Sequence, residues 1–434
     1  ELQEGMRSAG QKYFDSRDHP KTDPWCPRNG DSRWLGHESG LYEDIKARLE
    51  ADDSPDGLSF LQPTDEEELR DAVSAMRKDA SPGWSGETAG LLLNMSSYAW
   101  GRYVAVVNQI FADQHVHIRT VAGVVKHLAK KTNMTDEEKA NLSGAWRPIA
   151  QQSVALKACV AVFMKRVEAA SLYRSNSQKG FRRGHSVANA QSTLTNCMQA
   201  AKIEGRPMYM CFLDLKKAYD SVAFDVLEKI MAADSLGLAD EDVSFAMNML
   251  RNQSHRCLTA QGLSGTVEPK NGLPQGSVEA PTLFAMMLEP LMREIEQKHG
   301  HLGFNLGGLR IAIQAYADDM VLISETREGM QELLKVVGDY CQFSGLEIAT
   351  GREKTASMAV NAPTGLPAFE VKDRIGDAPP QQIFDLGTGS YRYLGLRVSN
   401  SDSWTEEIKH RLEKLHADGE GLLAHNVSLR QMQE

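Results

Sequence analysis

Two adjacent acids at the tip of an expected hairpin constrain the fold of this chain more than any other feature. The segment Tyr316-Ala317-Asp318-Asp319 lies between two apolar runs, 309–313 and 320–323, that read as short strands. Adjacent carboxylates repel each other and are costly to desolvate, and a hard cation such as Mg²⁺ would relieve both penalties. Aspartate also suits ordinary turns. The pair alone therefore leaves a turn and a metal site equally open.

Composition narrows the class of protein. The chain has 434 residues, 41% hydrophobic and 24% charged, which is typical of a globular protein of two or three domains. No apolar run approaches the roughly 18 residues of a membrane span, and no signal peptide is visible, so we expect an intracellular protein without membrane contact. Nuclear and cytoplasmic locations are not distinguished. Glu1 in place of an initiator Met suggests a segment of a longer product.

Cysteine usage and charge distribution add two expectations. The six cysteines are scattered without a C-x-x-C pair, which disfavours a zinc site and fits a reducing compartment. The net charge of −10 excludes a uniformly basic nucleic-acid binder. Acids nevertheless dominate 37–79 and bases dominate 115–190. This layout suits phosphates and metal ions, although solvated helix faces that balance across the fold would give the same counts.

Periodicity and turn residues predict a mixture of helices and strands. The region 126–148 is basic and broken, and Thr64 is expected to cap a helix with Glu67 three residues later. Strands are expected at 208–213 and 391–398. Helices are expected at 41–49, from 64 onward, within 88–113, at 153–172, 224–233, 281–299 and 328–343, and after Ser403.

Two further segments carry candidate chemistry. Asp214 ends the apolar strand 208–213, and it would meet the hairpin acids if the two strands pair. An ordinary helix cap or turn is the alternative for this residue. The loop Gly272-Leu273-Pro274-Gln275-Gly276 allows close approach of a backbone or base, and Gln275 can hydrogen-bond a base edge. A plain helix-entry loop is the alternative there.

Together these segments resemble the palm motifs of reverse transcriptases in order, spacing and residue identity. The resemblance covers about residues 78–400 and is greatest to the non-LTR retrotransposon branch, with group II intron enzymes as a more distant relative. The segments that carry it are Phe212-Leu213-Asp214-Leu215-Lys216-Lys217-Ala218-Tyr219-Asp220, Gly272-Leu273-Pro274-Gln275-Gly276, Tyr316-Ala317-Asp318-Asp319, Trp146-Arg147-Pro148-Ile149, Gln178-Lys179-Gly180-Phe181-Arg182-Arg183-Gly184-His185-Ser186, Ser81-Pro82-Gly83 and Tyr393-Leu394-Gly395.

The resemblance implies a metal site and a nucleotide site. Asp214, Asp318 and, less directly, Asp319 would hold two Mg²⁺ ions, which Mn²⁺ could replace, with help from the Leu215 carbonyl. Tyr219 would block a 2′-hydroxyl and so select deoxynucleotides. Arg147, with Lys130 or Lys131, would hold the incoming triphosphate. Gln275 and Gly276 would track the templating pair.

The resemblance also implies contacts to the nucleic-acid strands. Phe181 and Arg182 would line the template path, and Tyr393, Leu394 and Gly395 would grip the primer. Lys354 would protonate the leaving pyrophosphate as a general acid. There are three departures from the family pattern. Ala280 replaces a serine, the segment before Lys354 is longer than usual and lacks the customary asparagine, and the Ser81-Pro82-Gly83 loop lacks its usual aspartate.

These features predict an α+β fold of the right-hand polymerase type, with a palm built on an antiparallel sheet with flanking helices. The expected parts are an N-terminal extension at 1–68, fingers at 69–204, a palm at 205–360, and a connection with a truncated helical thumb at 361–434. The predicted function is RNA-directed DNA synthesis from an RNA template, a DNA primer and dNTPs, with any nuclease domain elsewhere in a longer polyprotein. An inactive nucleic-acid-binding scaffold is the alternative. An RNA-templated RNA polymerase is a third reading, which Tyr219 disfavours.

Overall fold

The computed structural model describes residues 59–78, 82–83, 85–117, 122–130, 135, 146–170, 175–182, 184–233, 236, 238–259, 262–363, 365–376 and 378–400. The helices expected at 41–49 and after Ser403, and Lys131, lie outside these residues. So do most of the expected N-terminal extension and the expected thumb beyond 400.

A five-stranded sheet forms the centre of the larger part of the fold. Its strand order is β13-β10-β3-β9-β8, and β3 pairs antiparallel with both of its neighbours. The register places Leu213 opposite Met320, so the end of β3 lies beside the start of β9. The strands are β3 (Met208–Leu213), β8 (Ile313–Tyr316), β9 (Asp319–Ser324), β10 (Ala356–Val360) and β13 (Phe384–Asp385).

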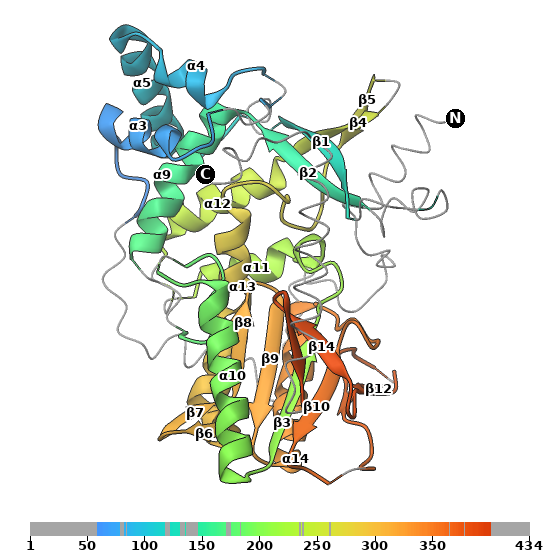
Figure 1. The fold of residues 1–434 in the computed structure, drawn as a ribbon. Coiled ribbons are helices and arrows are strands. Elements are labelled where there is room, and N and C mark those ends of the chain that lie inside the picture. The colour runs from blue at the N-terminus through green and yellow to red at the C-terminus, as the bar shows by residue number, and fades with distance from the viewer. Residues whose placement is uncertain are drawn as a thin grey trace, which may run out of the picture.

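Both faces of this sheet are covered, which explains why β3 is buried along its whole length. Side chains alternate along a strand, so Met210 and Phe212 face one hydrophobic cluster while Cys211 and Leu213 face another. Helix α10 (Val187–Glu204) and the hairpin of β14 (Ser390–Tyr393) and β15 (Leu396–Ser399) cover the first face (Figure 1). The opposite face packs on α11 (Phe224–Met231), α13 (Ala280–Glu294) and α14 (Arg327–Ser344).

A second, four-stranded sheet lies at the other end of the molecule (Figure 1). Its order is β2-β1-β4-β5, with β1 antiparallel to β2 and parallel to β4. These strands were missed in the sequence, where 126–148 reads as basic and broken. The strands are β1 (Ala122–Ala129), β2 (Trp146–Gln152), β4 (Ser254–Thr259) and β5 (Gly262–Val267).

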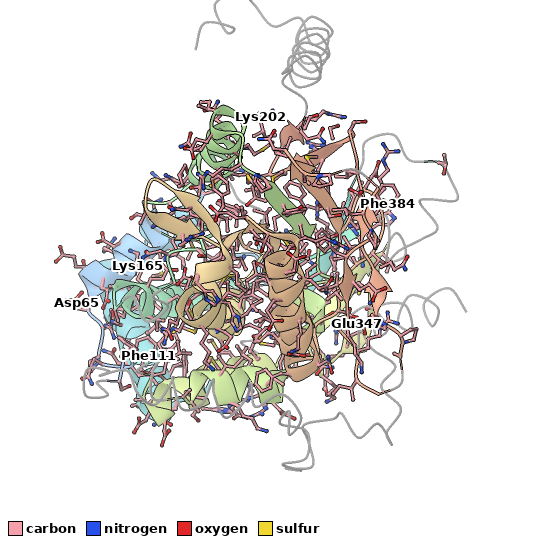
Figure 2. All side chains as sticks on the ribbon, turned by 90° about the horizontal axis from the view of Figure 1, so that it is seen from below. Asp65, Phe111, Lys165, Lys202, Glu347 and Phe384 are labelled. Carbon is pink, nitrogen blue, oxygen red and sulfur yellow. The ribbon has the colours of Figure 1, made fainter. Side chains whose placement is uncertain are left out.

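Helices surround one side of this second sheet. Phe111, which is labelled in Figure 2, packs edge-on against Phe245 with ring centroids 5.8 Å apart, and Phe163 packs against the same ring. These three rings join α5, α9 and α12 into one core. The helices are α3 (Glu66–Ser74), α4 (Ala89–Leu93), α5 (Ser97–Asp113), α9 (Val154–Ala169) and α12 (Asp240–Arg251).

Three local expectations need correction. The run 309–313 is two strands: β7 (Leu309–Ile311) pairs with β6 (Phe304–Leu306), and β8 alone pairs with β9. The run 391–398 is a hairpin rather than one strand, because Leu394 and Gly395 both take positive φ angles, 51° and 86°, in a tight turn. The cap of α3 is Asp65, which accepts from the Glu68 N–H, while the Thr64 hydroxyl donates to Glu68.

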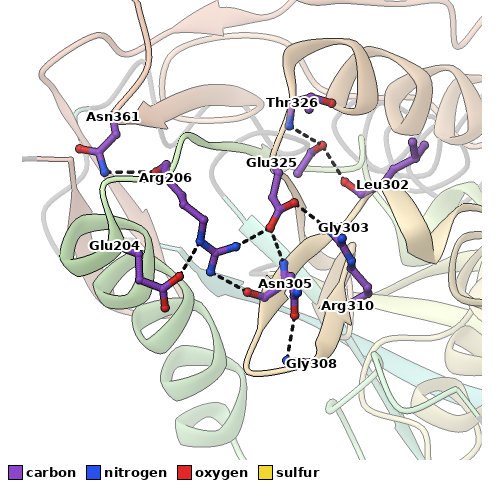
Figure 3. Close-up of polar contacts among 11 residues, drawn as sticks. Glu204, Arg206, Leu302, Gly303, Asn305, Gly308, Arg310, Glu325, Thr326 and Asn361 are labelled. Carbon is purple, nitrogen blue, oxygen red and sulfur yellow. Dashed lines mark hydrogen bonds and ion pairs between the residues drawn. The ribbon is translucent and has the colours of Figure 1, made fainter.

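An ion-pair network ties the end of the main sheet that lies away from the acids (Figure 3). Glu325, just after β9, accepts from Arg206 at 2.6 Å and from Arg310 at 2.8 Å. Arg206 also donates to the Asn305 carbonyl at 2.8 Å. Charge-assisted bonds shared among several groups hold better than isolated surface pairs. The network therefore joins the start of β3, the β6–β7 hairpin and the end of β9.

The described cysteines are all free and buried: Cys159, Cys197, Cys211, Cys257 and Cys341. Within the described ranges, no helix is both long and apolar enough to cross a membrane. The remaining short elements are η3 (Tyr219–Ser221), the π-helix η5 (Ile295–His299), η6 (Gly300–Leu302), β11 (Glu370–Val371) and β12 (Gln381–Gln382).

Candidate active site

The turn between β8 and β9 presents the paired acids. Tyr316 pairs with Asp319, so Ala317 and Asp318 form the two-residue connection. Ala317 has φ 56°, in the left-handed region. For a residue with a Cβ this conformation costs about 1–3 kcal/mol and persists only where neighbours fix it. The turn is therefore strained, and its shape sets where both carboxylates lie.

Asp214 reaches the same place from the end of β3. Its backbone N–H donates to the Thr355 hydroxyl at 3.1 Å, and its carbonyl accepts from the Ala349 N–H at 2.8 Å. Its carboxylate pairs with Lys354, with 2.7 Å between Oδ2 and Nζ. The structure thus brings together Asp214, the hairpin acids and Lys354, as the sequence predicted. Leu215, the next residue, is buried and bridges to Ile348.

Burial and the neighbouring negative charges raise the pKa of the two hairpin acids. Burial, followed by the Asp214 charge, raises the pKa of Asp318. Asp319 is exposed at the surface, but partial desolvation, with repulsion from Asp318 and Asp214, raises its pKa to about 6. Such a cluster of anions suits a hard divalent cation, which takes carboxylate oxygens.

The donor set therefore fits divalent cations in its chemistry. Across the described ranges, however, no three His, Cys, Asp or Glu side chains are already arranged as ligands of one ion. The Lys354 ammonium accounts for part of the difference, because it is the cation that pairs with Asp214 here. A bound divalent ion would compete with Lys354 for the same carboxylate.

Basic side chains face the acids from the second sheet. Arg147 on β2 and Lys130 after β1 are exposed, and burial together with repulsion from Arg147 and Lys354 lowers the pKa of Lys130. The Lys354 and Arg147 charges also act on Asp318. Arg147 therefore lies within electrostatic reach of Asp318, and Lys130 lies within electrostatic reach of Arg147 and Lys354.

Tyr219 lies in η3, directly after the Asp214 strand. Its ring stacks on Phe284 of α13, with centroids 4.8 Å apart and planes 12° apart. Its carbonyl accepts from the Leu273 N–H at 2.8 Å. Burial first, and the negative charge of Asp318 second, raise the pKa of Tyr219. The proposed sugar-selecting ring is thus fixed beside the acids by an aromatic partner that the sequence did not reveal.

The loop containing Gln275 and Gly276 joins β2 of the second sheet to η3, the short helix that follows β3. The Ala150 N–H on β2 donates to the Gln275 carbonyl at 2.8 Å. A Cβ on Gly276, which has φ +95°, would lie 2.9 Å from the Ile149 side chain. The Gln275 amide donates to Asp220 at 3.4 Å. Despite its departure from the family pattern, Ala280 starts α13, and its N–H donates to the Ser277 hydroxyl.

The residues expected to contact the nucleic-acid strands fall into two groups, one exposed and one that contacts the protein itself. The Phe181 ring is 44% exposed and lies 6.4 Å from the Tyr316 ring, near the acids. By contrast, Arg182 donates to the carbonyls of Ser175 and Gln178, so its guanidinium fastens its own loop.

The expected primer-gripping residues divide in the same way. Tyr393 is 2% exposed and packs on Phe212 at 5.7 Å, inside the core. The Leu394–Gly395 turn is partly accessible, and Gln191 of α10 donates to the Leu394 carbonyl at 3.0 Å. The tyrosine therefore supports the turn from beneath.

Two further residues contact the site without having been assigned a role in the sequence. Tyr391 stacks on Phe212 at 4.3 Å, and its hydroxyl donates to the Lys354 carbonyl. Gln178 hydrogen-bonds both peptide groups of Ala317. The only sequence signal for Gln178 was its place in the Q-x-G-F-R segment, and Tyr391 gave none beyond its alternation with Tyr393.

Comparison with known proteins agrees with this geometry. Residues 129–398 match the family model described as reverse transcriptase (RNA-dependent DNA polymerase). A retrovirus-related Pol polyprotein from the type-1 retrotransposable element R2 of Nasonia vitripennis is 25% identical over 79% of this chain. The Pol polyprotein of element R2DM of Drosophila melanogaster is 26% identical over 62% of the chain. A probable RNA-directed DNA polymerase from transposon BS of the same fly is 23% identical over 87%. The chain spans 32%, 25% and 40% of these three relatives.

Proposed function

Because the chain belongs to the reverse transcriptase family, we propose that it is an RNA-directed DNA polymerase of a retrotransposon-type element. It transfers deoxynucleotides onto the 3′-hydroxyl of a DNA primer along an RNA template. The observation that carries this proposal is the meeting of Asp214, from β3, with Asp318 and Asp319 beside a group of cationic side chains.

In the proposed reaction the three acids are the metal ligands. Asp214, Asp318 and the Leu215 carbonyl bind two divalent cations, Mg²⁺ or Mn²⁺, and Asp319 contributes less directly. When bound, the cations activate the primer hydroxyl and neutralise the charge that develops on the leaving pyrophosphate. Lys354 then moves from Asp214 to the pyrophosphate, to which it donates a proton as general acid.

The cationic and aromatic residues hold and select the nucleotide. Arg147 binds the triphosphate as a bidentate fork, and Lys130 or Lys131 adds a point charge. Tyr219 excludes a ribose 2′-hydroxyl by steric clash, supported by its stacking on Phe284. Gln275 and Gly276 lie against the templating base pair, a role that the anchoring of their loop to β2 and η3 supports.

The proposed layout is a right hand. Fingers extend over 69–204, the palm over 205–360, and the connection and thumb over 361–434. We add β4 and β5 to the fingers, since β4 pairs with β1. Phe181 and Arg182 line the template path, Phe181 with its ring and Arg182 by holding the loop. Leu394 and Gly395 contact the primer over the buried Tyr393.

The wider setting follows from the relatives. They are longer Pol polyproteins, so we propose that a nuclease domain accompanies this one in a longer product that acts inside the cell. A nuclear or cytoplasmic location is not distinguished.

Primer extension tests the function. A purified protein that contains residues 1–434 is given an RNA template, a DNA primer, dNTPs and Mg²⁺, and Asp318→Ala is the control. Extension by the wild type and none by the variant is the expected result. Binding of the primer–template without extension by a folded wild type would instead identify a nucleic-acid-binding scaffold. A preference for rNTPs would identify an RNA polymerase.

A further inference from the structure

The side chain of Gln178 closes a two-point clamp on the residue that shapes the acidic turn. Its Nε2 donates to the Ala317 carbonyl at 3.1 Å, and its Oε1 accepts from the Ala317 N–H at 2.9 Å. The same Oε1 accepts from the Gly180 N–H at 2.8 Å. Gln178 is only 2% exposed, so these bonds form away from competing water.

Ala317 is the residue of this turn that most needs such a clamp. Its φ of 56° is unfavourable for any residue that carries a Cβ. Strained backbone of this kind survives where the surroundings over-determine it. Asp318 and Asp319 follow directly in the chain. The backbone at Ala317 therefore decides the direction from which both carboxylates enter the site.

The segment around Gln178 is fixed along the edge of the main sheet. The Lys179 N–H donates to the Ala315 carbonyl at 2.8 Å, and the Ala315 N–H donates to the Ser177 carbonyl at 2.9 Å. This short parallel bridge runs beside β8, which ends the named strand order of the sheet. A Cβ on Gly180 would lie 2.3 Å from the Ala317 nitrogen, so the two loops meet with no space between them.

Two acids, the buried Glu289 on α13 and Glu296 on η5, hold this segment on its other side. Glu296 accepts from the Ser177 N–H and from the Ser175 hydroxyl, each at 2.9 Å. Glu289, which is 1% exposed, accepts from the Ser175 N–H at 3.0 Å. The segment that carries Gln178 is therefore anchored to α13, the helix that also carries Phe284, and to η5. Its position is fixed by these contacts.

We propose that Gln178 is a positioning residue for the reaction: through Ala317 it holds Asp318 and Asp319 in the geometry that receives the divalent cations. The inference deepens the proposed polymerase function and rests on it for the identity of the ligands. It predicts that loss of the clamp lowers cation affinity and turnover while the triphosphate-binding Arg147, on the other sheet, is little affected.

Gln178→Met removes the amide at nearly constant volume, and Gln314→Met is the matched control. Gln314 lies on β8, is 7% exposed, and its Nε2 donates to the neighbouring Ile313 carbonyl at 2.9 Å. Hydrogen exchange is followed in the peptide that contains Ala317. We expect faster exchange in Gln178→Met than in the wild type or the control. Unchanged exchange would refute the clamp, whether or not the protein is active.

Cation binding is measured directly with Mn²⁺, by electron paramagnetic resonance on the primer–template complex. We expect Gln178→Met to bind Mn²⁺ roughly tenfold more weakly, the equivalent of about 1.4 kcal/mol. We also expect a lower kcat with dNTP KM changed by less than about twofold. A rise in KM without a change in kcat or Mn²⁺ affinity would overturn the proposal.

A second variant separates strain from general loss of folding. Glycine adopts positive φ without steric cost, so Ala317→Gly in the Gln178→Met background should recover part of the Mn²⁺ affinity. No recovery would refute strain at Ala317 as the reason for the clamp. A wild type that binds Mn²⁺ but never extends a primer would remove the polymerase function and leave the clamp standing. An active wild type, together with unaltered Mn²⁺ binding in Gln178→Met, would remove the clamp and leave the polymerase function standing.

Discussion

Replacing Phe284 with leucine should loosen sugar selection without touching the substrate site directly. The Phe284 ring is fully buried on α13 and stacks on Tyr219 at 4.8 Å with planes 12° apart. Leucine fills much of the same volume but offers no flat face. Tyr219 would then be free to tilt away from the position in which it blocks a 2′-hydroxyl.

The size of the effect follows from the strength of the stack. Aromatic pairs contribute about 0.5–1.5 kcal/mol beyond the area they bury. If that energy holds Tyr219 against a ribonucleotide, discrimination should fall by about twofold to twelvefold, since 1.36 kcal/mol corresponds to a factor of ten. Tyr219→Ala removes the blocking ring itself and should have the larger effect.

The assay is single-nucleotide incorporation, with kcat/KM measured for a dNTP and for the matching rNTP. Phe245→Leu is the control, because Phe245 is equally buried but packs on Phe111 and Phe163. The control should lose stability and keep its selectivity. The reasoning fails if Phe284→Leu keeps the wild-type ratio. It also fails if Phe284→Leu still lowers the ratio when Tyr219 is already alanine, since the two changes must act through one ring.

Three further outcomes are expected. Asp318→Asn should reduce extension by about 1,000-fold, because metal stabilisation is worth several kcal/mol, while fluorescence anisotropy shows unchanged primer–template binding; equal loss of both would make Asp318 structural. Gly276→Ala should cost about 1–3 kcal/mol and lower the melting temperature, because its Cβ would lie 2.9 Å from Ile149 at φ +95°; an unchanged melting curve would mean that the loop rearranges. Burial lowers the pKa of His255 to about 4 from 6.5. The unfolded state therefore binds more protons than the folded state below pH 6.5, and the free energy of unfolding should fall by about 2 kcal/mol between pH 7 and pH 5. In urea titrations, His255→Gln should lack this dependence on pH.

The parts of the fold that could be predicted are those in which the local sequence pattern shows which residues are buried. Strand β3, α14 and the β8–β9 turn carry continuous or periodic apolar residues, and the structure confirms them. The second sheet was missed because the buried residues of β1 and β2 include glycine, proline and glutamine rather than a regular apolar series; they are Gly123, Val125, Pro148, Ala150 and Gln152. The β14–β15 hairpin was missed because Leu394 takes a positive φ, which a leucine in a sequence does not indicate.

The candidate site divides along the same line. Asp214 and Asp318, which the sequence singled out, lie near each other in the structure. Arg182 and Tyr393 belong to other segments of the same family resemblance, and the structure uses Arg182 to hold a loop and Tyr393 to fill the core. A motif is therefore a mixture of reacting and supporting residues. The sequence alone does not show which residues of a motif take part in the reaction and which support them, because residues of both kinds stand next to each other in the motif.

What finally assembles the site is pairing over long distances in the chain. Gln178 bonds to Ala317 across 139 residues, and Asp214 bonds to Thr355 across 141. The Asp214–Thr355 contact requires the register in which Phe212 faces Ala356, and the Gln178–Ala317 contact requires the bridge between Gln178 and Ala315. The meeting of Asp214 with the hairpin acids requires the register in which Leu213 faces Met320. A slip of one residue would turn every side chain of β9 to the other face of the sheet, and would carry Asp319 away from Asp214. Burial of β9 on both faces makes such a slip costly. The hydrophobic core of the sheet, rather than the acids themselves, therefore fixes the distances on which the proposed chemistry depends.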